Sequence, residues 1–559
     1  MKFYCIVLTL LVSLGLSAQS LTVNLDDPQQ EFEGGGVSVS LFLGHHFSMN
    51  AENQDKAVRL INEDINMQYL QDYPDERYPS DDPPYFQRRV DYFKAAKAYN
   101  PEIKISMVGN KFPDDLRTDQ VVNGNTYRVL DTDDPEIYDK LADWFFQLFQ
   151  YYKDNDLEIE VFNVVNEPDL INPCTGGSCR QYEYGYDGDT KKGVALIFSQ
   201  AVPKFKAMLN DPTINTSGIK MPLIMGPSSF SPNGCLTYIK YFKENYPEAW
   251  DQIDIVAVHQ YGNGARSDLF QDILGEIGDK PFHQSETHAA KGAGGIDDLG
   301  NLPVSESVRT VLSLSRIFST AVNNGVSAWY YFMNNYPGDF QPPGLIQVAW
   351  QSDNPIPYKH YYAYKQLTTA QPANSSVLSY EADFPSGDIV AFKHPDVDTL
   401  YVQIANYLSV NRKITISLDN GGVSEPMLGV KAERTDDTRN SEEILNEVYE
   451  SPASEIEFVT TPYSLSTLKI GLGSTITSVG ESQLRQPLIS LSSEGLTIES
   501  ETAIEQVAAY LLSGKRLFKV DDIRSNKYVN TEMNQYSGLI ILKVQTIDNQ
   551  FSKKIYLNK

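Results

Sequence analysis

The sequence predicts an α/β protein: a (β/α)8 TIM barrel with an attached β-sandwich side domain and a small C-terminal all-β domain. Three observations support this fold class. Short apolar runs alternate with longer amphipathic segments eight times within residues 34–370, which is typical of parallel strands alternating with helices. Residues 371–472 instead carry short segments in which apolar and polar residues alternate. A Ser-, Thr- and Gly-rich linker at 473–484 then leads to a last β-rich region at 485–559.

Length and charge limit the possible organisation and partners. The 559 residues are too many for one hydrophobic core, so several domains are expected. The formal net charge of −27 argues against nucleic acid and anionic membrane surfaces as partners, because both bind through clustered lysine and arginine.

Residues 1–19 predict a secretory signal peptide. Lys2 precedes an apolar run, Phe3–Leu16, and small residues follow that run. The run is too short to cross a bilayer, and no other apolar segment is long enough. We therefore expect a secreted or cell-surface protein without a membrane span.

The four cysteines fit an exported protein. Cys5 lies in the predicted signal peptide, and Cys174 and Cys179 bracket a short loop. In an oxidising compartment this spacing predicts a disulfide between Cys174 and Cys179. Cys235 is then left over, and we expect it to be a buried small hydrophobic residue.

The predicted elements follow one another regularly. Residues 20–33 alternate in polarity, and we expect this strand to join the side domain. Barrel strands are predicted at 34–41, 65–70, 103–108, 159–165, 222–226, 253–259, 281–286 and 326–333. Helices are predicted at 51–63, 85–99, 135–153, 190–209, 235–245, 268–277, 305–323 and 359–367.

Eight strand–helix units favour a closed barrel over an open doubly wound sheet. An open sheet usually carries a Gly-rich phosphate turn after its first strand, whereas Gly34-Gly35-Gly36 lies at the start of a strand. Strands of the side domain are predicted at 389–393, 399–405, 413–418, 455–459 and 464–470. We interpret the charged stretch 430–450 as a surface insertion.

Barrel enzymes carry their reactive groups at the C-terminal ends of the strands. The candidate site residues at the predicted strand ends are His45, His46, Asn166, Glu167, His259, Tyr261, Glu286, His288 and Trp329.

Glu167 and Glu286 follow the fourth and seventh predicted strands. Strands three positions apart in an eight-strand ring bring their ends together across the mouth, so the two carboxyl groups can lie about 5–5.5 Å apart. Cleavage of an acetal with retention needs two such groups, one acid and one nucleophile, and it needs neither a metal nor a cofactor. Burial would favour the protonated form of Glu167, while hydrogen-bond donors would keep Glu286 ionised.

These motifs resemble those of the retaining glycoside hydrolase superfamily of (β/α)8 enzymes called clan A, and the layout is similar to glycoside hydrolase family 30. The resemblance covers roughly residues 21–472. The residues that carry it are Val164-Val165-Asn166-Glu167-Pro168, Ser285-Glu286, Gly34-Gly35-Gly36, Val258-His259-Gln260-Tyr261-Gly262, Ser327-Ala328-Trp329-Tyr330 and Pro462-Tyr463-Ser464-Leu465.

The resemblance implies that Glu167 is the acid/base and Glu286 the nucleophile. It also implies that Asn166 binds the sugar hydroxyl next to the cleaved bond and that Tyr261 supports the nucleophile. The chain departs from the family at the end of the second predicted strand, where the family commonly has an arginine and this sequence has Met67-Gln68-Tyr69.

Residues 485–559 resemble the C-terminal sorting domain of the type IX secretion system of the Bacteroidetes. The matching residues are Leu512-Ser513-Gly514-Lys515 and Phe551-Ser552-Lys553-Lys554-Ile555-Tyr556. The resemblance implies that the type IX secretion machinery is a partner and that the chain is exported to the cell surface or the medium.

The leading hypothesis is a secreted retaining endo-glycoside hydrolase that cleaves β-linked polysaccharide by double displacement. Alternatives are an exo-acting β-glycosidase on oligosaccharides or glycolipid, and a non-catalytic carbohydrate-binding protein on the same barrel. A metal-dependent hydrolase that uses His259, His283, Glu286 and His288 is a further alternative. It is weakened because strand alternation would turn His283 and Glu286 to opposite faces.

Overall fold

The computed structural model of the chain contains two compact units, Met1–Thr475 and Ile476–Lys559, each of which is treated by itself. The structure describes residues 19–39, 43–74, 76–170, 190–261, 266–288, 308–336, 344–348, 354–385, 388–472, 488–492, 495–511, 516–530, 538–546 and 550–557.

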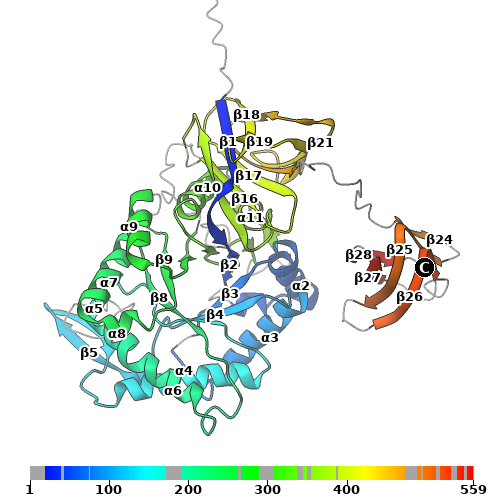
Figure 1. Cartoon of the computed structure of the whole chain (residues 1–559). Coiled ribbons are helices and arrows are strands. Elements are labelled where there is room, and N and C mark those ends of the chain that lie inside the picture. Colours follow the sequence, from blue (N-terminus) through cyan, green and yellow to red (C-terminus); the bar gives the residue numbers. More distant parts are fainter. Residues whose placement is uncertain are drawn as a thin grey trace, which may run out of the picture. The chain divides into compact units, whose positions relative to one another are not determined.

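Eight parallel strands close into a barrel in the first unit, so the predicted fold class is confirmed (Figure 1). The order around the ring follows the chain, and the last strand pairs with the first. The barrel strands are β2 (Gly34–Ser38), β3 (Tyr69–Asp72), β4 (Lys104–Val108), β7 (Val161–Asn163), β8 (Leu223–Ser229), β9 (Ile255–His259), β10 (Phe282–Glu286) and β11 (Ala328–Tyr331).

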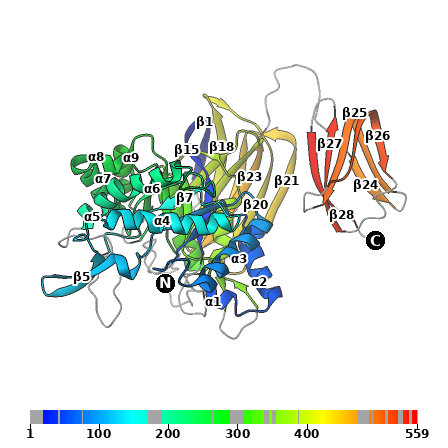
Figure 2. The ribbon, with the colours of Figure 1, turned by 90° about the horizontal axis from the view of Figure 1, so that it is seen from below.

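Helices surround these strands on the outside (Figures 1 and 2). Polar caps and prolines start several of them: Asp82 accepts from the backbone of Tyr85, and Ser231 accepts from that of Gly234. The helices are α1 (Leu43–His46), α2 (Ala51–Arg59), α3 (Pro83–Tyr99), α4 (Ile137–Asp154), α5 (Thr190–Leu196), α6 (Val202–Asn210), α7 (Pro232–Asn245), α8 (Pro247–Trp250), α9 (Ser267–Ile277), α10 (Val308–Val322) and α11 (Lys359–Thr369).

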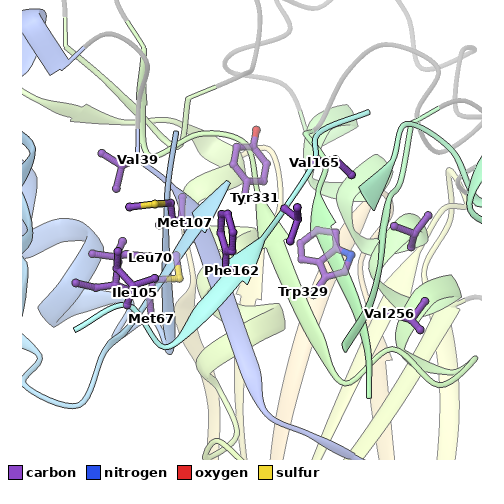
Figure 3. Close-up of a cluster of buried hydrophobic side chains, with 14 of the residues drawn as sticks. Val39, Met67, Leu70, Ile105, Met107, Phe162, Val165, Val256, Trp329 and Tyr331 are labelled. Carbon is purple, nitrogen blue, oxygen red and sulfur yellow. The ribbon is translucent and has the colours of Figure 1, made fainter. Parts of the chain in front are cut away.

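The main hydrophobic core lies between the strands and the helices, and Figure 3 shows part of it. Phe145 and Phe149 of α4, for example, pack on Phe162 of β7 with ring centroids 4.8 and 5.2 Å apart. A smaller cluster drawn from five strands fills the barrel interior: Tyr69, Val161, Met225, Ile255, Ala257, Ala328 and Tyr330. Because the interior is filled, chemistry is confined to the ends of the strands.

The side domain is a ten-stranded sheet that curls around its own core. The N-terminal strand β1 (Gln19–Phe32) lies inside this sheet, antiparallel to β15 and parallel to β18. The sheet packs on α10 and α11 of the barrel. Its other strands are β15 (Ser375–Ala382), β16 (Ile389–Lys393), β17 (Thr399–Asn406), β18 (Arg412–Asn420), β19 (Val423–Ser424), β20 (Met427–Thr435), β21 (Glu442–Ala453), β22 (Glu455–Thr460) and β23 (Ser464–Leu472).

Two smaller sheets belong to the same unit. One combines β12 (Asn335–Tyr336), β13 (Ile346–Gln347) and β14 (Ile356–Pro357). The other is a hairpin of β5 (Arg117–Val122) and β6 (Asn125–Leu130), which the sequence analysis missed. Its two-residue connection, Asn123-Gly124, has positive φ at both positions, as an Asn-Gly hairpin turn requires.

Residues 430–450 do not form the predicted insertion. They contribute to strands β20 and β21, and β21 is the edge of the curled sheet. Most side chains of β21 are exposed and many are acidic, so this edge strand lacks the half-buried alternation of apolar and polar residues that predicts a strand.

The second unit is a five-stranded antiparallel sheet with a small apolar core. Its strands are β24 (Leu488–Ser492), β25 (Gly495–Leu511), β26 (Arg516–Asn530), β27 (Gly538–Thr546) and β28 (Gln550–Leu557). This agrees with the all-β character predicted for the C-terminal region.

Several sequence predictions fall outside the described residues: residues 1–18 of the signal peptide, Cys174 and Cys179, and residues 512–515. Cys235 is described and buried, with Sγ 3.5 Å from the carbonyl oxygen of Ala257. No helix in the described ranges is long and apolar enough to cross a membrane.

Candidate active site

Glu167 and Glu286 meet at the C-terminal end of the barrel with His259 between them. Glu167 follows β7, Glu286 ends β10 and His259 ends β9. Nδ1 of His259 lies 2.9 Å from Oε1 of Glu167 and 3.7 Å from Oε1 of Glu286. One oxygen of each glutamate lies within 4.8 Å of the other. The two residues are 7% and 5% exposed, so they form one buried cluster around a single imidazole.

The end of β8 fixes the backbone that carries Glu167. Glu167 has φ 45°, in the left-handed region that non-glycine residues seldom adopt, and its N–H donates to the carbonyl oxygen of Ser228 (2.9 Å). Asp169 accepts from the backbone N–H of Phe230 (2.6 Å). Gly234 makes room for this contact, since a Cβ there would lie 1.9 Å from Oδ2 of Asp169. The glutamate is thus held in place by surrounding structure.

Two tyrosine hydroxyls hold the carboxylate of Glu286. Tyr261 donates to Oε1 (3.0 Å), and Tyr73 donates to Oε2. Burial raises the pKa of each tyrosine hydroxyl well above the usual value for tyrosine, and the nearby charges of Glu286 and Glu167 raise it further. Both hydroxyls therefore keep their protons at neutral pH.

Tyr73 was not predicted, because the second barrel strand was placed too early. The alternating residues 65–70 predict this strand, but Asn66 has φ 61° and the strand begins only at Tyr69. The strand therefore ends at Asp72, and Tyr73 follows it at the mouth. Tyr73 lies four residues after Tyr69, the first residue of the observed strand.

The charges of the cluster depend on one another. Burial raises the pKa of Glu286 to about 7, and Glu167 adds to this, while His259 and the two tyrosines oppose it. Burial alone would lower the pKa of His259, but the carboxylates of Glu286 and Glu167 outweigh it, and the pKa lies above its usual value. The carboxylates therefore favour the protonated form of His259, and a proton on His259 favours the ionised form of Glu286.

The raised pKa of Glu286 predicts a pH-dependent stability. Between its usual pKa of 4.5 and the folded value of about 7, the folded state binds more protons, so wild-type stability falls as pH rises. Glu286→Gln has no charge to bury. We expect its stability relative to wild type to increase by roughly 3 kcal/mol from about pH 4.5 to about pH 8. Thermal unfolding of both proteins across this range measures it, and a constant difference would contradict the assignment.

Asn166 lies beside the cluster. It precedes Glu167, is buried, and its Nδ2 donates to Oδ1 of Asn110 (3.1 Å), which follows β4. This position at the mouth is compatible with contact to a substrate. Binding of a sugar hydroxyl by Asn166 stays a prediction.

His288 lies next to Tyr261, with ring centroids 5.1 Å apart. Burial lowers the pKa of His288 to about 4, so the imidazole is neutral at pH 7. Its Nδ1 has no hydrogen-bond partner among the described residues. A neutral ring nitrogen can bond to a hydroxyl group, but it offers no positive charge to an acidic sugar.

Trp329 does not lie with these residues, and its position contradicts the predicted substrate contact. The side chain is 0% exposed on the outer face of the barrel. It packs on Phe318 of α10 and stacks on Tyr364 of α11, with centroids 5.2 and 5.5 Å apart. Its Nε1 donates to Gln260 (2.9 Å), so Trp329 links β11 to β9 within the core.

His45 and His46 lie on the short helix α1 after β2 and are buried. His46 packs edge-on against Phe47 and against Tyr92 of α3. Burial lowers the pKa of both histidines, that of His46 to about 4. Substrate contact by either residue stays a prediction.

The metal site proposed from the sequence is not assembled as expected. His283 lies at the other end of the barrel, where Nε2 is 3.1 Å from Oε1 of Glu33 and the ring packs on Tyr69. Strand β10 has a register shift between Gln284 and Glu286, so simple alternation does not govern its faces.

Within the described ranges, Glu167, His259 and Glu286 do have the spacing to share a metal ion. Only one imidazole contributes, and its Nδ1 already lies within hydrogen-bond distance of Oε1 of Glu167 (2.9 Å). The catalytic zinc and iron centres of enzymes usually use two or more histidines or thiolates, so the set fits such an ion poorly.

Comparison with solved structures places the fold among known barrels. A GH30 endoxylanase from Clostridium papyrosolvens matches with TM-score 0.60 and 16% identity over 81% of this chain and 100% of that chain. A conserved exported protein from Bacteroides fragilis matches with TM-score 0.61 and 12% identity, covering 80% and 100%. An endo-β1,6-glucanase matches with TM-score 0.56 and 14% identity, covering 81% and 94%. No protein-family model and no curated protein sequence matches the chain.

Proposed function

We propose that this chain is a retaining glycoside hydrolase in which Glu286 is the nucleophile and Glu167 the acid/base. The observation that carries the proposal is the separation of the two glutamates, whose nearest ligand oxygens lie within 4.8 Å. Retaining enzymes hold their carboxyl groups about 5–5.5 Å apart, whereas inverting enzymes leave about 6.5–9.5 Å for a water molecule. Structural neighbours that are named as an endoxylanase and an endo-β1,6-glucanase support action on a glycosidic bond.

The reaction proceeds in two displacements. In the first, the Glu286 carboxylate attacks the anomeric carbon, the bond to the leaving oxygen breaks, and protonated Glu167 gives its proton to that oxygen. In the second, the Glu167 carboxylate takes a proton from water, the water oxygen attacks the anomeric carbon, and the bond to Glu286 breaks. Two inversions restore the starting configuration.

His259 supports the proton transfers. The contact between its Nδ1 and Oε1 of Glu167 lets one proton lie on either group. The first displacement needs that proton on Glu167, and the second needs Glu167 ionised. An imidazolium in this position also reduces the repulsion between the two carboxylates while both are charged.

The substrate we propose is a β-linked polysaccharide, cleaved internally by a secreted or cell-surface enzyme. The N-terminal apolar run and the β-rich C-terminal region support export, with the type IX machinery as the proposed partner. Asn166 and His288 are the proposed contacts to sugar hydroxyls. The neighbours named above act on different polymers, so neither supplies the sugar for this chain.

A reducing-end release screen tests the proposal. Wild type and Glu286→Gln are incubated with soluble plant and algal polysaccharides, and product sizes are analysed. Short oligomers from wild type alone would support an endo-hydrolase and identify the substrate class. Single sugars would indicate the exo-acting alternative, and equal activity of the two proteins would remove Glu286 from the mechanism.

The metal-dependent alternative makes an opposite prediction about chelators. If the two carboxylates act without a metal, dialysis against EDTA leaves kcat unchanged within about two-fold, since no step requires a Lewis acid. Activity on the best polymer of the screen, measured before and after dialysis, checks this. A loss that zinc or manganese restores would assign Glu167, His259 and Glu286 to a metal.

A further inference from the structure

The second carboxylate oxygen of Glu286 has a dedicated donor. Tyr73 directly follows β3, which lies four positions around the ring from β9, the strand before Tyr261, and it is almost completely buried. Its hydroxyl donates to Oε2 of Glu286, while Tyr261 donates to Oε1. The two oxygens are therefore held separately, by residues from opposite sides of β10.

Gln71 fixes the direction of the Tyr73 hydrogen bond. Its Nε2 donates to the Tyr73 hydroxyl oxygen (2.7 Å) and also to the carbonyl oxygen of Ser285 (3.0 Å). A phenol has one proton, and here an amide N–H already approaches its oxygen as a donor. The Tyr73 proton is therefore directed to Glu286, and Gln71 ties the same unit to the backbone beside the glutamate.

The neighbouring residue on β3 anchors this strand end in the surrounding helices. Asp72 forms a buried ion pair with Arg89 of α3 and accepts from Tyr152 of α4. Arg89 also donates to the hydroxyl of Tyr85 (2.5 Å), so its guanidinium bonds to Asp72 and Tyr85. In the described part of the chain, Glu286 is thus held by neutral hydroxyls and by His259.

We propose that Gln71 and Tyr73 form a hydrogen-bond relay that positions Glu286, holding Oε2 so that Oε1 is presented to the anomeric carbon. Tyr73 is a positioning residue, because it acts through the nucleophile. The inference rests on the proposed function for its catalytic consequence, but the hydrogen bond to Glu286 can be tested without a substrate.

Tyr73→Phe removes one hydroxyl and keeps the ring. A donor to a carboxylate stabilises its ionised form, so losing the donor raises the pKa of Glu286. We expect the acid limb of the kcat/KM profile to move up by about one to two pH units. At optimal pH we expect kcat to fall about 10- to 100-fold with little change in KM, because the nucleophile is less well oriented.

Two further variants separate positioning from general damage. Tyr152→Phe removes an equally buried phenol that donates to Asp72, and the acid limb should stay at its wild-type pH. Gln71→Leu frees the Tyr73 hydroxyl to rotate, so we expect a shift in the same direction but smaller. An unshifted acid limb in Tyr73→Phe, or an equal shift in Tyr152→Phe, would overturn the proposal.

A substrate-free titration separates this inference from the proposed function. Glu286→Gln is introduced into wild type and into Tyr73→Phe, and thermal unfolding of the four proteins is followed across pH. For each background this gives the pH at which Glu286→Gln becomes stabilising. In the Tyr73→Phe background this pH should rise by about one to two units. An unchanged pH would overturn the relay, while inactive wild type together with a shifted pH would contradict only the glycosidase assignment.

Discussion

Glu286→Gln should lower kcat by about 10⁴-fold or more on any glycoside that the wild type cleaves. The amide keeps the size of the side chain but cannot attack the anomeric carbon, so no covalent intermediate forms. KM should change little, because the amide keeps the size of the carboxyl group and its oxygen can still accept from one of the two tyrosine hydroxyls. Steady-state kinetics on the best polymer of the screen measure this effect.

Glu33→Gln is a matched control for that variant. Glu33 is a second glutamate of the same barrel, held by His283 and Tyr69 at the opposite end. Burial would raise the pKa of Glu33, but His283, Tyr69 and Ser327 outweigh it and lower it to about 2. Losing this paired carboxylate should reduce thermal stability and leave kcat of the folded enzyme near wild type. Equal loss of kcat in both variants would point to general disruption.

Glu167→Gln should lower activity by an amount that depends on the leaving group. A sugar alkoxide needs a proton to depart, so we expect a loss of about 10²- to 10⁴-fold on the natural polymer. A dinitrophenolate leaves without protonation, so the first displacement on an aryl glycoside should be nearly unaffected. The second displacement stays slow because no base activates water, so the glycosyl-enzyme should accumulate. Its formation should be seen as a burst of about one dinitrophenolate per enzyme molecule.

Azide provides the confirming measurement for Glu167. This small anion needs no general base, so it should release the trapped sugar as a glycosyl azide of retained configuration. Stopped-flow detection of the burst and product analysis with azide check both expectations. The same loss on polymer and aryl glycoside, with no effect of azide, would contradict an acid/base role for Glu167.

The sequence predicted the barrel and its two glutamates because both follow from local patterns. Glu167 lies four residues beyond β7 and Glu286 is the last residue of β10, so an error of two residues in a strand boundary does not move either from the mouth. The bridging position of His259 was not predictable. It depends on how three successive strands are staggered around the ring, and the sequence does not encode that stagger locally.

The sequence wrongly placed Trp329 at the site and gave no sign of Tyr73, for different reasons. In β11, Ala328 and Tyr330 point into the barrel while Trp329 and Tyr331 face the helices. All four are apolar or aromatic, so the alternation is regular but its phase cannot be read from composition. At β3, residues 65–70 alternate in polarity like a strand, but the left-handed backbone of Asn66 delays the strand to Tyr69–Asp72, so the predicted strand end lies before Tyr73.

The configuration of the first product tests the central claim most directly. Proton NMR follows the anomeric signals while wild type cleaves its best β-linked substrate, before mutarotation mixes the two forms. Double displacement by Glu286 and Glu167 predicts that the β-anomer appears first and the α-anomer follows at the spontaneous rate. Initial release of the α-anomer would mean a single displacement by water, and it would contradict the nucleophilic role of Glu286.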